Sequence, residues 1–176
     1  MSKRLPVELN IPRLCANKAR LRGTIKLSQF KRLAEYLREP GTGDLDVELK
    51  FANNPESVGS TVDGYYSGDA KLECHRCAEV MDFRLAGQIS LAMVQTDAEA
   101  EHVDGNYDPF PLDESGRVRS VELIEDELIL QIPLAPRHSD EQQCAIADWI
   151  SFVANEDNEP NESRDVNPFD VLKNLS

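Results

Sequence analysis

Apolar and polar residues alternate along four stretches of the chain, which is the pattern of strands that bury one face of a sheet. These stretches are residues 20–27, 45–51, 60–74 and 81–93. Short polar turns separate the last three, so consecutive strands are expected to pair antiparallel. Gly87 interrupts the longest run and is predicted to mark a bend or bulge. The pattern predicts a curved antiparallel sheet, either open or barrel-like.

Apolar residues recur at helical spacing in two further stretches, residues 29–38 and 121–131. Ser28 and Ser120 stand where helix N-caps are expected, and a proline follows each stretch closely. Residues 5–14 are punctuated by prolines and are expected to be extended. Three acidic residues lie off the apolar face of the second helical stretch and are expected to be solvated: Glu122, Glu125 and Asp126. The sheet and the helices together predict the α+β fold class with two main helices.

The composition changes along the chain and predicts three parts. Residues 1–154 are expected to form a single α+β domain with a basic N-terminal third. Residues 155–165 are acidic and polar with little to bury, so a disordered linker is predicted. Residues 166–176 regain apolar side chains and are predicted to be a docking segment, either on this chain's own domain or on a partner. Its expected contact residues are Asn167, Pro168, Phe169 and Leu172.

Charge is distributed unevenly along the chain. Residues 1–38 hold ten basic and two acidic side chains, a formal charge of +8, whereas the whole chain carries −13, which leaves −21 on residues 39–176. Phosphate attraction is local and is screened beyond about 10 Å at ordinary salt, so an acidic protein can still dock on RNA through one basic face. The candidate RNA-binding residues are Arg20, Arg22, Lys26, Lys31, Arg32 and Arg38. The alternative is that these cations only form a solvated face.

Two short clusters carry the residues with the most specific chemistry: Cys74 with Cys77, and His138 with Cys144. A Cys-x-x-Cys pair on a tight turn aims two thiolates at one point, which suits zinc or a reversible disulfide. The second cluster would complete a tetrahedral set, so one interpretation is a structural zinc that joins two distant segments. The other is a redox or unliganded thiol pair. His75, inside the Cys pair, is expected to point to solvent.

The composition also argues against several classes of protein. No run approaches the roughly 18 apolar residues of a membrane span, and no apolar signal region follows the N-terminus. We therefore expect a soluble, cytoplasmic protein whose cysteines are thiols or ligands and not disulfides. The sequence contains no phosphate-binding loop and no nucleophile-elbow motif. No enzyme, no small-molecule substrate and no cofactor other than a structural zinc is indicated.

Several features occur in a characteristic order. They are the basic N-terminal third, the Cys-x-Arg-Cys turn at 74–77, an acidic loop at 95–116, the run from Val121 to Pro136, His138, Cys144 and the Asn-Pro-Phe sequence at 167–169. This order resembles the YceD family of bacterial large ribosomal RNA subunit accumulation proteins, and the resemblance runs across nearly the whole chain. It implies a cytoplasmic, non-enzymatic factor needed for 23S ribosomal RNA accumulation and large-subunit biogenesis. It also implies that Cys74, Cys77 and Cys144 occupy the family's cysteine positions.

Three functions are compatible with these observations. A ribosome-biogenesis factor would use the basic surface against large-subunit rRNA or a pre-ribosomal particle, and its acidic remainder against basic ribosomal or RNA-processing proteins. A thiol-disulfide oxidoreductase would use Cys74 and Cys77, although such pairs usually stand at a helix N-terminus and this pair lies between two predicted strands. A pure protein–protein adaptor would rely on Phe169. The sequence favours the first function.

Overall fold

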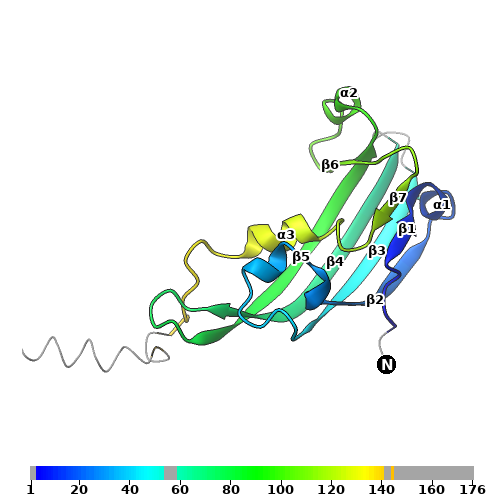
Figure 1. Ribbon diagram of the computed structural model, residues 1–176. Coiled ribbons are helices and arrows are strands. Elements are labelled where there is room, and N and C mark those ends of the chain that lie inside the picture. The colour runs from blue at the N-terminus through cyan, green and yellow to red at the C-terminus, as the bar shows by residue number, and fades with distance from the viewer. Residues whose placement is uncertain (1–2, 54–58, 141–143, 145–176) are drawn as a thin grey trace, which may run out of the picture. The chain divides into compact units, whose positions relative to one another are not determined.

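The computed structural model describes residues 3–53, 59–140 and 144 of the chain (Figure 1). The chain divides into two compact units, residues 1–138 and 139–176, and the fold described below belongs to the first. Its main strands are β2 (Arg20–Lys26), β3 (Asp44–Asn53), β4 (Ser60–Glu73), β5 (Val80–Val94) and β6 (Asp108–Pro111). The shorter elements are β1 (Glu8–Asn10), β7 (Arg117–Arg119), α1 (Ile11–Ala16), α2 (Asp97–Ala100) and α3 (Glu125–Gln131).

The five main strands form one sheet in the order β2-β3-β4-β5-β6. Strands β2 to β5 pair antiparallel with their neighbours, whereas β6 runs parallel to β5. The sheet is curved (Figure 1). It is not closed into a barrel, because β2 and β6 lie at opposite edges. The predicted α+β fold class with a curved antiparallel sheet is therefore confirmed. Each predicted strand also ends within two residues of its observed bounds.

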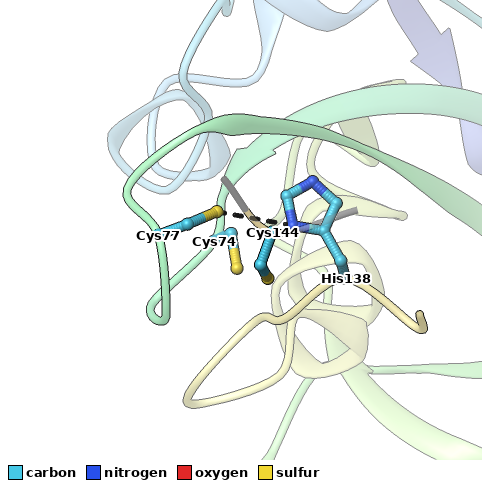
Figure 2. Close-up of side chains that lie close together, drawn as sticks. All are labelled: Cys74, Cys77, His138 and Cys144. Carbon is cyan, nitrogen blue, oxygen red and sulfur yellow. Dashed lines mark hydrogen bonds between the residues drawn. The ribbon is translucent and has the colours of Figure 1, made fainter. Parts of the chain in front are cut away.

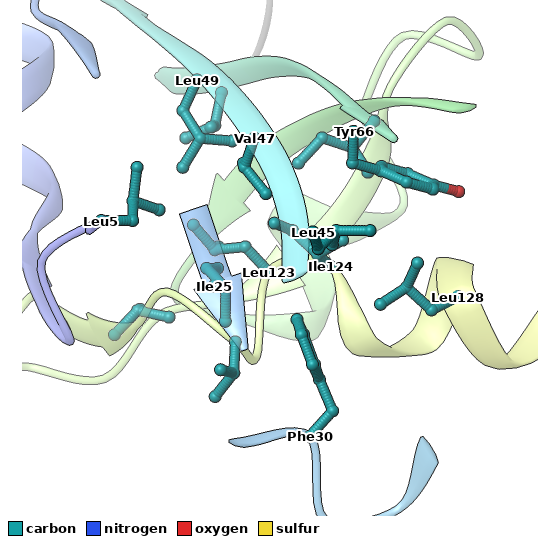
Figure 3. Packing of buried hydrophobic residues seen from close by; sticks show 14 of the residues in the cluster. Leu5, Ile25, Phe30, Leu45, Val47, Leu49, Tyr66, Leu123, Ile124 and Leu128 are labelled. Atoms are coloured by element: carbon teal, nitrogen blue, oxygen red, sulfur yellow. The ribbon is translucent and has the colours of Figure 1, made fainter. Parts of the chain in front are cut away.

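The hydrophobic core lies on one face of this sheet. Leu45 and Val47 of β3 point into it, and their charged neighbours along the strand face away. Phe30 packs on this face together with Ile124 and Leu128 at α3 (Figure 3). Full burial of such a side chain contributes about 1.5–3 kcal/mol. This burial holds α3 against the sheet.

The helix predicted over residues 29–38 is wrong. The chain instead forms two single 3-10 turns, Leu27–Gln29 and Leu33–Glu35, with Phe30 in an extended conformation after the first. Phe30 and the first residue of each turn are fully buried. Helix propensity is weak in so short a segment, so the burial of these side chains overrides the helical spacing.

The N-terminal segment contains a helix that the sequence prediction missed. Residues 5–14 were expected to be extended, but α1 begins within them at Ile11. The Asn10 side chain accepts a hydrogen bond from the Arg13 N–H at 3.0 Å, and Pro12 stands in the first turn, where it needs no N–H partner. Prolines there start a helix instead of preventing one.

Two smaller differences concern later segments. Pairing of β4 with β5 runs unbroken through Gly87, so a bulge, one of the two features predicted there, is absent. The glycine instead leaves room for the Tyr66 hydroxyl, which a Cβ would approach to 2.6 Å. Helix α3 begins at Glu125, four residues later than predicted.

Among the described residues, no helix has the length and apolar character that crossing a bilayer requires.

Gly23 lies on β2 beside the N-terminal segment, which forms a parallel bridge with the strand between Arg4 and Thr24. The Lys3 C=O accepts a hydrogen bond from the Thr24 N–H, and the Leu5 N–H donates to the Thr24 C=O, both at 3.0 Å. A Cβ on Gly23 would overlap the Lys3 carbonyl oxygen and lie 2.8 Å from the Leu5 nitrogen. We expect Gly23→Ala to reduce the free energy of unfolding by about 1–3 kcal/mol in urea denaturation, because backbone atoms cannot rotate away. Gly41→Ala is the control, since a Cβ there meets nothing within 4 Å; equal losses would contradict the close approach.

Candidate functional site

The turn between β4 and β5 carries Cys74 and Cys77, as the sequence predicted. The Cys74 N–H donates to the Glu79 C=O at 2.9 Å and the Ala78 N–H donates to the Cys74 C=O at 2.8 Å. Ala78 adopts a φ of 59°, a left-handed conformation that reverses the chain tightly. The Arg76 N–H donates back to Cys74 Sγ at 3.4 Å. The turn thus directs the backbone N–H groups of Arg76 and Cys77 at the Cys74 sulfur.

The segment after α3 meets this turn. Backbone at Ile132 is already extended, and Pro133 and Pro136 cannot donate the N–H groups that would continue a helix. The His75 N–H donates to the Pro136 C=O at 2.8 Å, which fixes the chain two residues before His138 beside the hairpin. The His75 side chain is exposed, as predicted.

Figure 2 shows the side chains of Cys74, Cys77, His138 and Cys144 close together. Their ligand atoms all lie within 4.8 Å of one another, and Cys77 Sγ lies 3.6 Å from His138 Nδ1. With Zn–S and Zn–N distances of about 2.3 and 2.0 Å, a tetrahedral site places sulfur atoms roughly 3.8 Å apart and sulfur and nitrogen roughly 3.5 Å apart. The Cys77–His138 separation already matches one edge of such a tetrahedron. The cluster could therefore hold a metal ion after a small contraction.

The surroundings of Cys74 favour its thiolate. Burial alone would raise the pKa of this thiol. Hydrogen bonds from the backbone N–H groups of Arg76, Cys77 and His138 outweigh the effect of burial and lower the pKa to about 5. The lowered pKa favours the thiolate, which is the form that binds zinc. Cys74 and Cys144 are buried, and Cys77 and His138 are half-buried. A bound ion would be largely shielded from water.

Half of the predicted RNA-binding residues are paired with acids. The pairs are Arg20 with Glu48, Arg32 with Glu125 and Asp126, and Arg38 with Glu73. Arg22, Lys26 and Lys31 are exposed and form no ion pair within the part of the chain that the structure describes. Arg20, Arg22 and Lys26 share the exposed face of β2. RNA contact by these cations stays a prediction.

The expectation that Glu125 is solvated is wrong, although Glu122 and Asp126 are exposed as predicted. Glu125 is 6% exposed, and its carboxylate accepts hydrogen bonds from the N–H groups of Arg32 at 2.8 Å and Leu33 at 3.2 Å. It also accepts one from Arg32 Nε at 3.3 Å. Glu125 thus caps a 3-10 turn from 93 positions away. The sequence pattern could not predict the burial of Glu125, because its hydrogen-bond partners belong to a 3-10 turn that was itself not predicted.

The predicted docking residues Asn167, Pro168, Phe169 and Leu172 lie outside the described residues, as does the predicted linker at 155–165. Their roles stay predictions, and so does a single domain over residues 1–154.

The comparisons with known proteins agree with the order of features along the chain. A family model described as "Large ribosomal RNA subunit accumulation protein YceD" matches residues 62–176, a range that includes all four members of the Cys/His cluster. A protein of the same description from Haemophilus influenzae is 30% identical over 154 residues, which span 87% of this chain and 85% of that protein. No solved structure gives a significant match. The resemblance seen in the sequence is thereby confirmed, and the chain belongs to the YceD family.

Proposed function

We propose that this chain is a non-enzymatic, cytoplasmic factor that supports accumulation of 23S ribosomal RNA and, through it, biogenesis of the large ribosomal subunit. Membership of the YceD family carries this proposal, because the family and its Haemophilus influenzae member are described as large ribosomal RNA subunit accumulation proteins. The proposed mode of action is binding to rRNA or to proteins of an assembling particle. The separate basic and acidic regions of the chain support a role in contacting both kinds of partner.

Within this function, the cluster of Cys74, Cys77, His138 and Cys144 is proposed to be a structural zinc centre. Four protein ligands fill a tetrahedral shell and leave no position for water or substrate, as in structural sites and unlike catalytic ones. The location of the pair between β4 and β5, and not at a helix N-terminus, supports this role over a thiol-disulfide oxidoreductase. The zinc would tie the segment after α3 to the end of the hairpin.

The exposed cations of β2 allow a test of RNA binding. Arg22 and Lys26 lie opposite Glu48 and Asp44 on β3, so glutamine is the better replacement, because glutamate would place like charges side by side. If both cations contact rRNA, the Arg22→Gln, Lys26→Gln double variant should bind large-subunit precursor particles roughly tenfold more weakly, and the slope of log affinity against log salt should fall by about 2. Co-sedimentation through sucrose at several salt concentrations measures both quantities.

The matched control is the Arg13→Gln, Arg119→Gln double variant, which removes one exposed cation from α1 and one from β7, neither of which forms an ion pair among the described residues. Equal losses in the two double variants would show that total charge matters and not the β2 surface. Unchanged binding by the β2 variant would reject RNA contact there. Arg32 is unsuitable for this test because it also contacts Glu125. The proposed function itself fails if cells without the protein keep a normal ratio of 23S to 16S rRNA.

A further inference from the structure

An apolar groove lies beside α3 in the unit formed by residues 1–138. It consists of two adjoining hollows of about 430 and 550 Å³, which share Tyr36, Ile129 and Leu130 among their lining residues. The larger hollow continues along Pro133 and Leu134. Volumes of this order can accept several side chains, since ligand pockets typically measure about 300–1,000 Å³.

Three large apolar side chains of this groove face solvent. Tyr36 is 53% exposed, Leu130 is 77% exposed and Leu134 is 100% exposed. None of the three belongs to the hydrophobic core, so the packing of the fold does not account for them. A single exposed apolar residue is ordinary, but three around one groove are typical of a surface that contacts another protein.

The rim of the groove is acidic. Glu35, Glu73 and Asp126 line it together with one cation, Arg32. Asp126 pairs with Arg32 and Glu73 pairs with Arg38, whereas Glu35 forms no ion pair among the described residues. An incoming cation therefore finds an exposed, uncompensated carboxylate beside an apolar floor, which is an arrangement complementary to a basic amphipathic segment.

We propose that this groove binds a short basic amphipathic segment of a partner protein, with apolar side chains against Leu130 and Leu134 and a lysine or arginine at Glu35. The inference rests on the proposed function, since it names the class of protein through which the chain would hold an assembling particle. The chain's own C-terminal segment is a poorer occupant, because residues 155–165 before it are acidic and the acidic rim repels them. A second copy of the chain is also a poorer occupant, because its own acidic rim would be repelled by this one.

Fluorescence anisotropy with the full-length protein and three synthetic peptides of about 14 residues tests this inference. One peptide carries leucine on one helical face and lysine elsewhere, a second replaces the lysines with glutamate, and a third replaces the leucines with serine. We expect the leucine–lysine peptide to bind most tightly, and Leu134→Asp to weaken its binding about tenfold. Leu134 is fully exposed, so this variant should fold normally. Val7→Asp is the matched control, because Val7 is 60% exposed and lies outside the groove.

Equal peptide affinity in Leu134→Asp and Val7→Asp, or equal binding of the leucine–lysine and serine–lysine peptides, would overturn the groove as the binding site. If the Phe169→Asp variant binds the leucine–lysine peptide more tightly than the unaltered protein does, the C-terminal segment is the occupant of the groove. A dimer that Leu134→Asp dissociates in sedimentation would identify a second copy, and either result would overturn the partner assignment. If the peptide results fail while cells without the protein still lose 23S rRNA, the groove assignment is wrong and the proposed function stands.

Discussion

We expect the unaltered chain to hold about one zinc ion per molecule at the proposed zinc centre, and protein carrying Cys74→Ser to lose it. The Cys74 sulfur is buried and is surrounded by N–H donors, so it is the ligand for which a serine hydroxyl is the poorest substitute. A metal present at about a thousand times its dissociation constant stabilises the folded state by about 4 kcal/mol. The variant should therefore unfold at a clearly lower temperature. Zinc is measured by mass spectrometry after purification under reducing, chelator-free conditions.

Cys15→Ser is the matched control for this prediction. Cys15 is also buried, but it lies outside the Cys/His cluster, with its Sγ 3.8 Å from the Thr61 carbonyl oxygen. This variant should lose some stability through the buried hydroxyl and keep its zinc. A chelator should lower the unfolding temperature of the unaltered protein and of Cys15→Ser, but not that of Cys74→Ser. If the unaltered protein holds no stoichiometric zinc and its unfolding temperature does not change with the chelator, the proposal of a zinc centre is wrong.

The parts of the fold that could be predicted are those whose signal is local. Residues 45–51 alternate strictly, and a one-residue shift would expose every apolar side chain, so the sequence determines this strand closely. The turn that holds Cys74 and Cys77 follows from two such strands with few residues between them. The Cys74–Cys77 half of the candidate zinc cluster is local in the same way, whereas His138 lies 61 positions from Cys77 and could be proposed as a partner only from its ligand chemistry.

The parts that could not be predicted depend on contacts between distant segments. Residues 29–38 have helical spacing, but two 3-10 turns allow Leu27, Phe30 and Leu33 all to be buried in the core. Strand β6, which pairs parallel with β5, lies within residues 95–116, where the prediction of an acidic loop was therefore incomplete because this stretch contains no strand pattern. The apolar groove is formed by Tyr36 and Leu130, which are far apart in the chain and ordinary when considered singly.

Glu125→Ala is expected to reduce the free energy of unfolding by about 3–5 kcal/mol, a large loss for one acidic residue on a short helix. The Glu125 carboxylate is the acceptor for the N–H groups of Arg32 and Leu33, and alanine leaves both without an acceptor. A buried donor without a partner costs about 1–3 kcal/mol. The Leu33–Glu35 turn that these groups begin also buries Leu33 in the core, so its loosening would disturb packing under α3. Urea denaturation monitored by circular dichroism measures the loss.

Two further variants separate the cap from the ion pair. Glu125→Gln keeps an acceptor oxygen but removes the charge, so its loss should be smaller than that of Glu125→Ala. Asp126→Ala removes the exposed partner of the same arginine, at 2.6 Å from Arg32 Nη2, and should cost less than about 1 kcal/mol because exposed pairs are weak. Losses of the same size in Glu125→Ala and Asp126→Ala would show that the arginine contacts dominate. A loss that is largest in Glu125→Ala, smaller in Glu125→Gln and smallest in Asp126→Ala would instead show that Glu125 acts on the backbone of a turn 93 positions away.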